Sequence, residues 1–197
     1  MLETRGEAEP IQSSREDVEK KIERKESGKV YIVPTLQMNV IGYREDEQTF
    51  LKMLSEFVIG NTDTKMRLAT GYLNLQKEFM REILKSDFDG KVQLLTSSPR
   101  ANGFYKGGFV KKYIPGMYRA NEEILLKQVK GDNVHMFEYE KGDWTFHGKG
   151  AWLYEENEDK KSEVTMSIIG SSNFSYRSNR RDTECQLYIV SECDDLK

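Results

Sequence analysis

The chain has 197 residues, 37% of them hydrophobic and 32% charged, so it is long enough to bury the core of one domain beneath a charged exterior. Its formal net charge of −3 gives no overall attraction to nucleic acid or anionic lipid. No run approaches the ~18 apolar residues of a membrane-spanning helix. The acidic start M-L-E-T-R-G-E-A-E is unlike the acid-poor organellar targeting peptides, so no targeting signal is visible.

The first part of the chain predicts a charged lead-in and then alternating strands and helices. Residues 1–29 have almost no large apolar side chains, which predicts a flexible lead-in to a folded domain at residues 30–197. Apolar residues at helical spacing predict helices at 46–59 and 75–84, and Pro115 suits the start of a helix that runs to 128. The strands expected in this part are 30–33, 66–72 and 91–96.

The second part reads as a run of strands. These are expected at 134–140, 144–154, 164–169 and 183–191. Lys141-Gly142-Asp143 is expected to be the turn of a hairpin between the first two. Alternating strands and helices followed by strands alone predict an α/β fold, a mixed sheet flanked by helices. Cys185 and Cys193 are expected to be reduced thiols, because a bridge over this short spacing needs a sharp reversal of the strand.

The chain has only two histidines, and one of them lies in the sequence W-T-F-H-G-K-G-A-W. On an extended strand, residues two positions apart point to the same face, so His147 and Lys149 are expected to reach one small anion together. A segment G-S-S-N comes about twenty residues later and supplies hydroxyl, amide and backbone donors. A histidine between aromatic residues is often only a buried core residue. The neighbouring lysine favours a phosphate-binding site, because two cationic groups repel each other unless an anion lies between them.

Five further blocks accompany this motif in order along the chain. The six are P-T-L-Q-M (34–38), T-G-Y-L-N-L (70–75), S-S-P-R-A-N-G-F (97–104), Y-I-P-G-M-Y (113–118), F-H-G-K-G-A-W-L (146–153) and Y-R-S-N-R-R-D-T-E (176–184). Over roughly residues 31–190 they resemble the phospholipase D superfamily and, more narrowly, the C-terminal half of eukaryotic phosphatidylglycerophosphate synthases. The resemblance implies a phospholipase D-like mixed sheet that carries one of the two motifs of such an enzyme.

The resemblance also implies roles for individual residues. His147 would act on the phosphorus-bearing group, Lys149 would bind its nonbridging oxygens, and Glu184 would orient the imidazole, with Asp182 as a rival for that role. Ordinary turns and a solvated basic segment explain several of the remaining residues equally well. Asn173 completes the implied catalytic set, and the implied substrate-binding residues are Ser171, Arg177, Arg181 and Asn102.

The implied reaction is phosphatidyl transfer through a phosphohistidine. CDP-diacylglycerol and glycerol 3-phosphate would give phosphatidylglycerophosphate and CMP, on the route to phosphatidylglycerol and cardiolipin. The resemblance implies no metal or organic cofactor and a peripheral place on the mitochondrial inner membrane. The local excess of Lys and Arg between 100 and 130 fits an anionic headgroup or a membrane surface, but equally a solvated face. Nucleic acid is not an expected partner.

The chain departs from the two-motif pattern in having only one His-x-Lys. The superfamily's aspartate five residues after the lysine is also replaced, by Tyr154. We therefore expect a missing N-terminal half, or a second copy of this chain, to complete the site. Two alternatives stay open: a homodimeric single-motif phosphodiesterase or nuclease, and a catalytically inactive lipid-binding module.

Overall fold

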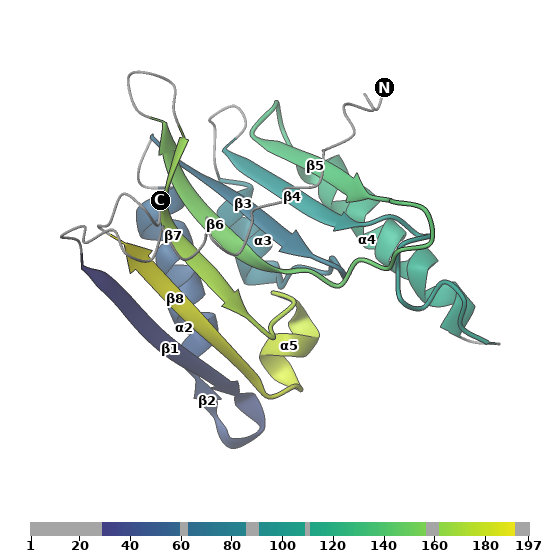
Figure 1. Cartoon of the computed structure of the whole chain (residues 1–197), viewed down its shortest axis with the longest axis horizontal. Coiled ribbons are helices and arrows are strands. Elements are labelled where there is room, and N and C mark those ends of the chain that lie inside the picture. Colours follow the sequence, from purple (N-terminus) through teal and green to yellow (C-terminus); the bar gives the residue numbers. More distant parts are fainter. Residues whose placement is uncertain (1–28, 60–62, 86–90, 109–110, 157–161, 192–197) are drawn as a thin grey trace, which may run out of the picture.

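One eight-stranded mixed sheet organises the molecule, with strand order β2-β1-β8-β7-β6-β3-β4-β5 (Figure 1). The computed structural model describes residues 29–59, 63–85, 91–108, 111–156 and 162–191. Strands β3, β4 and β5 are parallel to one another, and every other neighbouring pair is antiparallel. The strands are β1 (Val30–Met38), β2 (Tyr43–Arg44), β3 (Thr64–Thr70), β4 (Val92–Ser97), β5 (Val134–Tyr139), β6 (Lys149–Glu156), β7 (Ser162–Gly170) and β8 (Glu184–Ser191).

Helices α2 and α3 cover one face of this sheet, and α4 follows on the same side behind β4 and β5 (Figure 1). The first turn of α2 carries three acidic residues, which suit the positive end of the helix dipole. The described helical segments are η1 (Asn39–Ile41), α2 (Glu45–Met53), η2 (Leu54–Ile59, a π-helical turn), α3 (Lys77–Ile83), η3 (Lys111–Tyr113), α4 (Ile114–Gln128) and α5 (Tyr176–Arg180). The predicted mixed sheet flanked by helices is therefore confirmed.

The core lies between the sheet and the helices α2 and α3. Phe50 of α2 is fully buried, and its ring lies 4.8 Å from the rings of both Phe79 and Phe174. Fully burying an aromatic side chain of this size contributes about 1.5–3 kcal/mol of hydrophobic free energy. This core joins α2 and α3 to the segment before α5, so the three parts of the chain are held in a fixed relation.

Two expectations about the strands are wrong. Residues 141–143 do not turn a hairpin, because β5 pairs with β4 at the sheet edge while β6 pairs with β3 and β7. Residues 140–148 instead cross from one strand to the other, and β6 begins only at Lys149. The alternating aromatics of this segment imitate a strand, although Trp144 is exposed and Phe146 stacks on Tyr139 with centroids 5.0 Å apart.

Strand β1 is longer than expected, because Pro34 does not end it. The strand continues through Pro34 to Met38 and pairs with β8 from Val30 to Gln37. Its other neighbour, β2, reaches only Gln37 and Met38. Pro34 therefore has an unpaired side, which is where a strand tolerates the missing N–H of proline. The predicted lead-in, apart from Lys29, lies outside the described residues, and so does Cys193. Cys185 is a free, exposed thiol.

The strand directions bring many strand ends to one edge of the sheet. Strands β1, β3, β4, β5 and β7 end there, and β6 and β8 begin there. Binding sites of α/β sheets commonly form beyond the carboxyl ends of parallel strands. The segment with His147, the loop after β4 and the turn before α5 all lie at this edge, which we call the site edge.

Candidate active site

The structure brings His147 and Lys149 together at the site edge. His147 lies in the extended segment just before β6, and Lys149 is the first residue of that strand. The His147 Nε2 atom lies 2.9 Å from Lys149 Nζ. The imidazole is exposed and the lysine half-buried, so an anion arriving from solvent can approach both nitrogens.

Main-chain hydrogen bonds fix the position of the His147 segment. The N–H of Gly71 donates to the carbonyl of Gly148 at 3.0 Å, and the N–H of Phe146 donates to Ala101 at 2.8 Å. A side chain at position 71 would put its Cβ 2.7 Å from the Phe146 carbonyl oxygen and 3.2 Å from His147 Cα. Only glycine allows β3 to end this close to the histidine. The block T-G-Y-L-N-L therefore supplies the backbone against which the histidine lies.

Both nitrogen groups of the pair hold their protons less tightly than usual. Partial burial lowers the pKa of His147, and the charge of Lys149 lowers it further. Partial burial also lowers the pKa of Lys149, while Glu184 acts in the opposite direction. A bound phosphate would favour the charged forms of both groups. The pair is therefore poised to take up a proton when an anion binds.

Asn173 lies beside this pair through Thr70. Thr70 is opposite Lys149 in the β3–β6 ladder, and its hydroxyl donates to the Asn173 carbonyl at 3.3 Å. The Asn173 N–H donates to the Ser178 hydroxyl at 3.1 Å. By contrast, the Ser171 hydroxyl accepts from the Cys185 N–H at 3.1 Å, which extends the pairing of β7 with β8. Of the two predicted donors, Asn173 is thus the one that the contacts tie to the lysine.

Glu184 is buried at the start of β8. Its charge acts on Lys149, whereas the described hydrogen bond of the His147 ring leads to Lys149 and not to Glu184. Asp182, the rival carboxylate, forms an ion pair with Arg177 at 3.1 Å. Of the two candidate carboxylates, Glu184 is therefore the one whose charge acts on the Lys149 amine.

The basic cluster of 177–181 divides between the surface and the interior. Arg177 is exposed on α5 and acts electrostatically on Tyr118 of α4, so its charge faces the site edge. Arg181 is exposed just after α5. Arg180 instead points inward, with Nη2 3.5 Å from Glu47 Oε1. Arg177 and Arg181 are thus at the surface, although Arg177 is already paired with Asp182.

Asn102 lies in the loop after β4, where its side chain is buried. Its Oδ1 atom accepts from the N–H of Phe104 at 3.0 Å, so the side chain closes a local turn. The residue therefore shapes the loop that borders the site edge.

A tyrosine that is absent from the predicted set lies at the centre of the site. The Tyr72 ring meets the His147 ring edge-on, with centroids 5.3 Å apart, and also packs against Phe104 and Tyr118 at 5.5 and 5.4 Å. Burial raises the pKa of the Tyr72 hydroxyl. Tyr72 belongs to the block T-G-Y-L-N-L, and this membership could have marked it as a site residue. An aromatic residue at the end of a strand is, however, more often part of the hydrophobic core.

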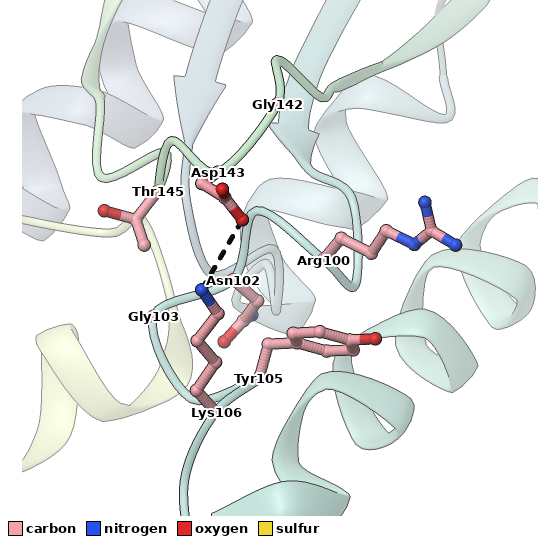
Figure 2. A pocket seen from close by; sticks show the side chains of 8 residues that line it. All are labelled: Arg100, Asn102, Gly103, Tyr105, Lys106, Gly142, Asp143 and Thr145. Carbon is pink, nitrogen blue, oxygen red and sulfur yellow. Dashed lines mark ion pairs between the residues drawn. The ribbon is translucent and has the colours of Figure 1, made fainter.

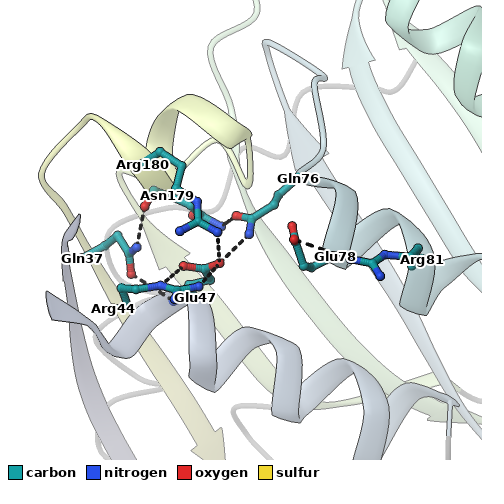
Figure 3. A network of polar contacts seen from close by, with 8 residues as sticks. All are labelled: Gln37, Arg44, Glu47, Gln76, Glu78, Arg81, Asn179 and Arg180. Atoms are coloured by element: carbon teal, nitrogen blue, oxygen red, sulfur yellow. Dashed lines mark hydrogen bonds and ion pairs between the residues drawn. The ribbon is translucent and has the colours of Figure 1, made fainter. Parts of the chain in front are cut away.

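A buried polar network, the Glu47 network, supports the segment that carries Asn173 and Arg177 (Figure 3). Glu47 is fully buried and accepts from Arg44, with Nε to Oε2 at 2.7 Å, and from Gln76. The Asn179 side chain in turn donates to Gln76, and the Gln37 side chain donates to the Asn179 carbonyl at 2.7 Å. These contacts link α2 and β1 to α5, so the position of α5 depends on them.

Metal ligands and membrane-spanning helices are both missing from the described part of the chain. Within the described ranges, no three His, Cys, Asp or Glu side chains gather so that they could hold a metal ion. Among the described helices, none combines the length and apolar character that crossing a bilayer requires.

A mixed α/β sheet that places an imidazole and an ammonium at one edge has a fold and a pair of groups that suit an anion. Residues 57–196 match the family model described as "Cardiolipin synthase, PLD-like domain". The chain belongs to this phospholipase D-like family.

Relatives and a solved structure agree with this assignment. The chain is 36% identical over 166 residues to the mitochondrial CDP-diacylglycerol–glycerol-3-phosphate 3-phosphatidyltransferase of Gallus gallus, and 34% identical over 183 residues to that of Homo sapiens. These matches cover 82% and 91% of the chain but only 28% and 32% of the relatives, so the chain spans about a third of their length. A phosphatidylserine synthase from Haemophilus influenzae shares the fold, with a TM-score of 0.62 at 21% identity over 82% of this chain and 35% of that one.

Proposed function

We propose that this chain forms one motif-bearing part of a phosphatidyltransferase that makes phosphatidylglycerophosphate and CMP from CDP-diacylglycerol and glycerol 3-phosphate. The observation that carries the proposal is the His147–Lys149 pair, with 2.9 Å between Nε2 and Nζ, at an open sheet edge. Relatives that bear this enzyme name match 82–91% of the chain, which supports the same reaction.

The proposed reaction has two displacements at the β-phosphorus of CDP-diacylglycerol. A histidine of a second motif attacks the phosphorus, and the bond to the CMP oxygen breaks while His147 donates a proton to that oxygen. His147, now neutral, then takes the proton from a hydroxyl of glycerol 3-phosphate. The oxygen of that hydroxyl attacks phosphorus and releases the first histidine.

The remaining residues hold the charged groups during these steps. Lys149 and Asn173 bind the nonbridging oxygens, where negative charge develops in the transition state. Glu184 holds the Lys149 ammonium in place. Arg177 and Arg181 bind either the pyrophosphate of CDP-diacylglycerol or the phosphate of glycerol 3-phosphate. Ser171 stabilises the turn before Asn173. Asn102 shapes the loop that follows β4.

We propose that the second histidine comes from a further segment of a longer polypeptide or from a second copy, because this chain has a single His-x-Lys. We also propose that residues 30–197 form one domain. The relatives are named as mitochondrial, and we propose the same organelle for this chain, on the surface of its inner membrane.

Exposed apolar and aromatic side chains at the site edge support a membrane surface as partner. Val40 and Ile41 of η1 are 81% and 72% exposed. Lys141 lies over the ring of Trp144 at 5.3 Å, and Lys112 over that of Tyr113 at 5.1 Å. Exposed Trp and Tyr paired with cations are typical of side chains that lie among lipid headgroups.

The test uses the protein that holds both motifs, with CDP-diacylglycerol in mixed micelles and radiolabelled glycerol 3-phosphate. We expect CMP and labelled lipid in equal amounts, and a His147→Ala variant at least about 10³-fold slower with an unchanged melting temperature. Near-normal turnover of that variant would discard the role of His147. Phosphodiesterase activity of a dimer of this chain without lipid transfer, or liposome binding without any turnover, would replace the proposal with one of its rivals.

A further inference from the structure

A polar cavity of about 440 Å³ opens at the site edge beside the histidine segment (Figure 2). It lies between the loop that follows β4 and the crossing segment that follows β5. Its volume falls within the range of about 300–1,000 Å³ that is usual for small-molecule sites. The side chains that line it include Arg100, Asn102, Tyr105, Lys106, Asp143 and Thr145.

The cavity adjoins His147. Thr145 lies two residues before the histidine, and the intervening Phe146 is hydrogen-bonded to Ala101 of the opposite loop. On that loop, a Cβ at Gly103 would lie 3.0 Å from the Tyr72 hydroxyl, and the Tyr72 ring packs on His147. A ligand with a phosphate at the His147–Lys149 pair can therefore extend into the cavity.

The lining combines three kinds of group. Lys106 supplies a cation 3.5 Å from the carboxylate of Asp143, and both side chains are largely exposed, so a ligand can separate them at little cost (Figure 2). Tyr105 presents a half-exposed flat ring, and Thr145 adds a hydroxyl. The cavity thus offers a partner for an anion, an acceptor for N–H or O–H donors, and a surface for stacking.

These groups discriminate between the parts of the proposed substrates. An acyl chain gains nothing from a charged lining. Glycerol 3-phosphate has no flat ring to stack on Tyr105 and no amino group to donate to Asp143. A cytidine nucleotide has a ring to stack, a phosphate for Lys106 and an exocyclic amino group that a carboxylate recognises.

We propose that this cavity binds the cytidine monophosphate part of the lipid donor, with the base stacked on Tyr105 and its amino group donating to Asp143. The inference rests on the proposed function, since that reaction supplies a cytidine nucleotide at this edge. It also assigns the orientation of the donor: the nucleotide lies on the β4–β5 side of His147, and the diacylglycerol on the other side.

Calorimetric titration of the chain with CMP, UMP and glycerol 3-phosphate tests the site. We expect CMP to bind at least about 10-fold more tightly than UMP, whose carbonyl replaces the amino group and is repelled by the carboxylate. Tyr105→Leu should weaken CMP binding by about 10-fold, the cost of losing one stacked base. Asp143→Asn should bring the CMP and UMP affinities within about 2-fold of each other.

Tyr31→Leu is the matched control, because Tyr31 is 47% exposed, against 48% for Tyr105, but lies at the opposite end of β1 from the site edge. The control should bind CMP as the unmodified chain does, and thermal melts should show all variants folded. Unchanged CMP affinity in folded Tyr105→Leu and Asp143→Asn variants, or glycerol 3-phosphate binding that depends on Tyr105, would overturn the assignment.

Turnover by the protein with both motifs separates this inference from the proposed function. Tyr105→Leu should raise KM for CDP-diacylglycerol and the inhibition constant of CMP about 10-fold, and leave KM for glycerol 3-phosphate unchanged. If phosphatidyl transfer is unchanged in the Tyr105→Leu and Asp143→Asn variants, the nucleotide site is overturned but the proposed function is not. CMP binding that depends on both residues in a protein without transfer would uphold the site and overturn the function.

Discussion

The Glu47 network and the His147–Lys149 pair place charges close together in opposite ways. Burial alone would raise the pKa of Glu47, but hydrogen bonds from Arg44 and Gln76 and the charge of Arg180 lower it below its usual value. At the site edge, the imidazole of His147 and the ammonium of Lys149 lie 2.9 Å apart, and the charge of Lys149 disfavours the protonated imidazole. The carboxylate of Glu47 has its hydrogen-bond partners within the protein, whereas the pair at the site edge is open to an anion from solvent. The first should therefore contribute stability, and the second should contribute chemistry.

The largest expected effect is on turnover, and it comes from the pair. Lys149→Met should slow the proposed phosphatidyl transfer by about 10³-fold, because it removes the cation that we propose for the nonbridging phosphate oxygens. The melting temperature should change little, because the contact with His147 that is lost lies at the exposed site edge. Steady-state kinetics and calorimetry measure the two quantities. If Lys149→Met lowers the melting temperature but leaves the specific activity of the folded protein unchanged, the pair serves stability and not activity, contrary to the comparison.

The next effect is on stability, and it comes from the network. Glu47→Ala should lower the free energy of unfolding by about 3–5 kcal/mol, because it leaves buried partners of a carboxylate unpaired. Urea unfolding measures this change. Glu56→Ala, at an exposed glutamate of the adjoining segment η2, is the control and should stay within about 0.5 kcal/mol. If Glu47→Ala lowers the free energy of unfolding by no more than Glu56→Ala does, the network contributes little to stability.

Tyr72 tests whether packing beside the pair serves the chemistry. Tyr72→Leu should slow transfer by about 10²-fold, because the imidazole loses the ring that holds its orientation. Tyr72→Phe keeps the ring and should stay within about 10-fold of the unmodified protein. The ¹⁵N shifts of His147 should report a changed tautomer ratio in the leucine variant only. If both variants lose activity equally, the hydroxyl rather than the ring is what matters.

The smallest expected effect is the shift in the pKa of His147. NMR titration should place the pKa of His147 below the 6.5 of an unperturbed histidine, and inorganic phosphate should raise it. The unfolded chain binds this proton more tightly than the folded one. The stability that depends on a neutral His147 is therefore fully present above pH 6.5, the pKa of an unperturbed histidine. It is lost as the pH falls through the lower pKa of His147 in the folded protein. A pKa at or above 6.5 without phosphate would contradict the repulsion from Lys149.

Local patterns in the sequence predicted the features that neighbouring residues determine. The helix expected at 115–128 is observed as α4 (Ile114–Gln128), because proline and apolar spacing mark it locally. Likewise, the spacing of His147 and Lys149 predicted their proximity. The hairpin at 141–143 was wrong because strand order depends on pairing between distant segments. The buried place of Glu47 was not predictable, since an acidic first turn of a helix usually faces solvent.

The anchoring of His147 through the main chain has a consequence for divergence and design. Gly71, Gly148, Phe146 and Ala101 hold the segment through backbone N–H and carbonyl groups. Exposed side chains nearby can therefore be exchanged without displacing the imidazole. A laboratory that wished to change which phosphorylated ligand the protein binds could randomise the cavity lining while leaving the His147 segment in place.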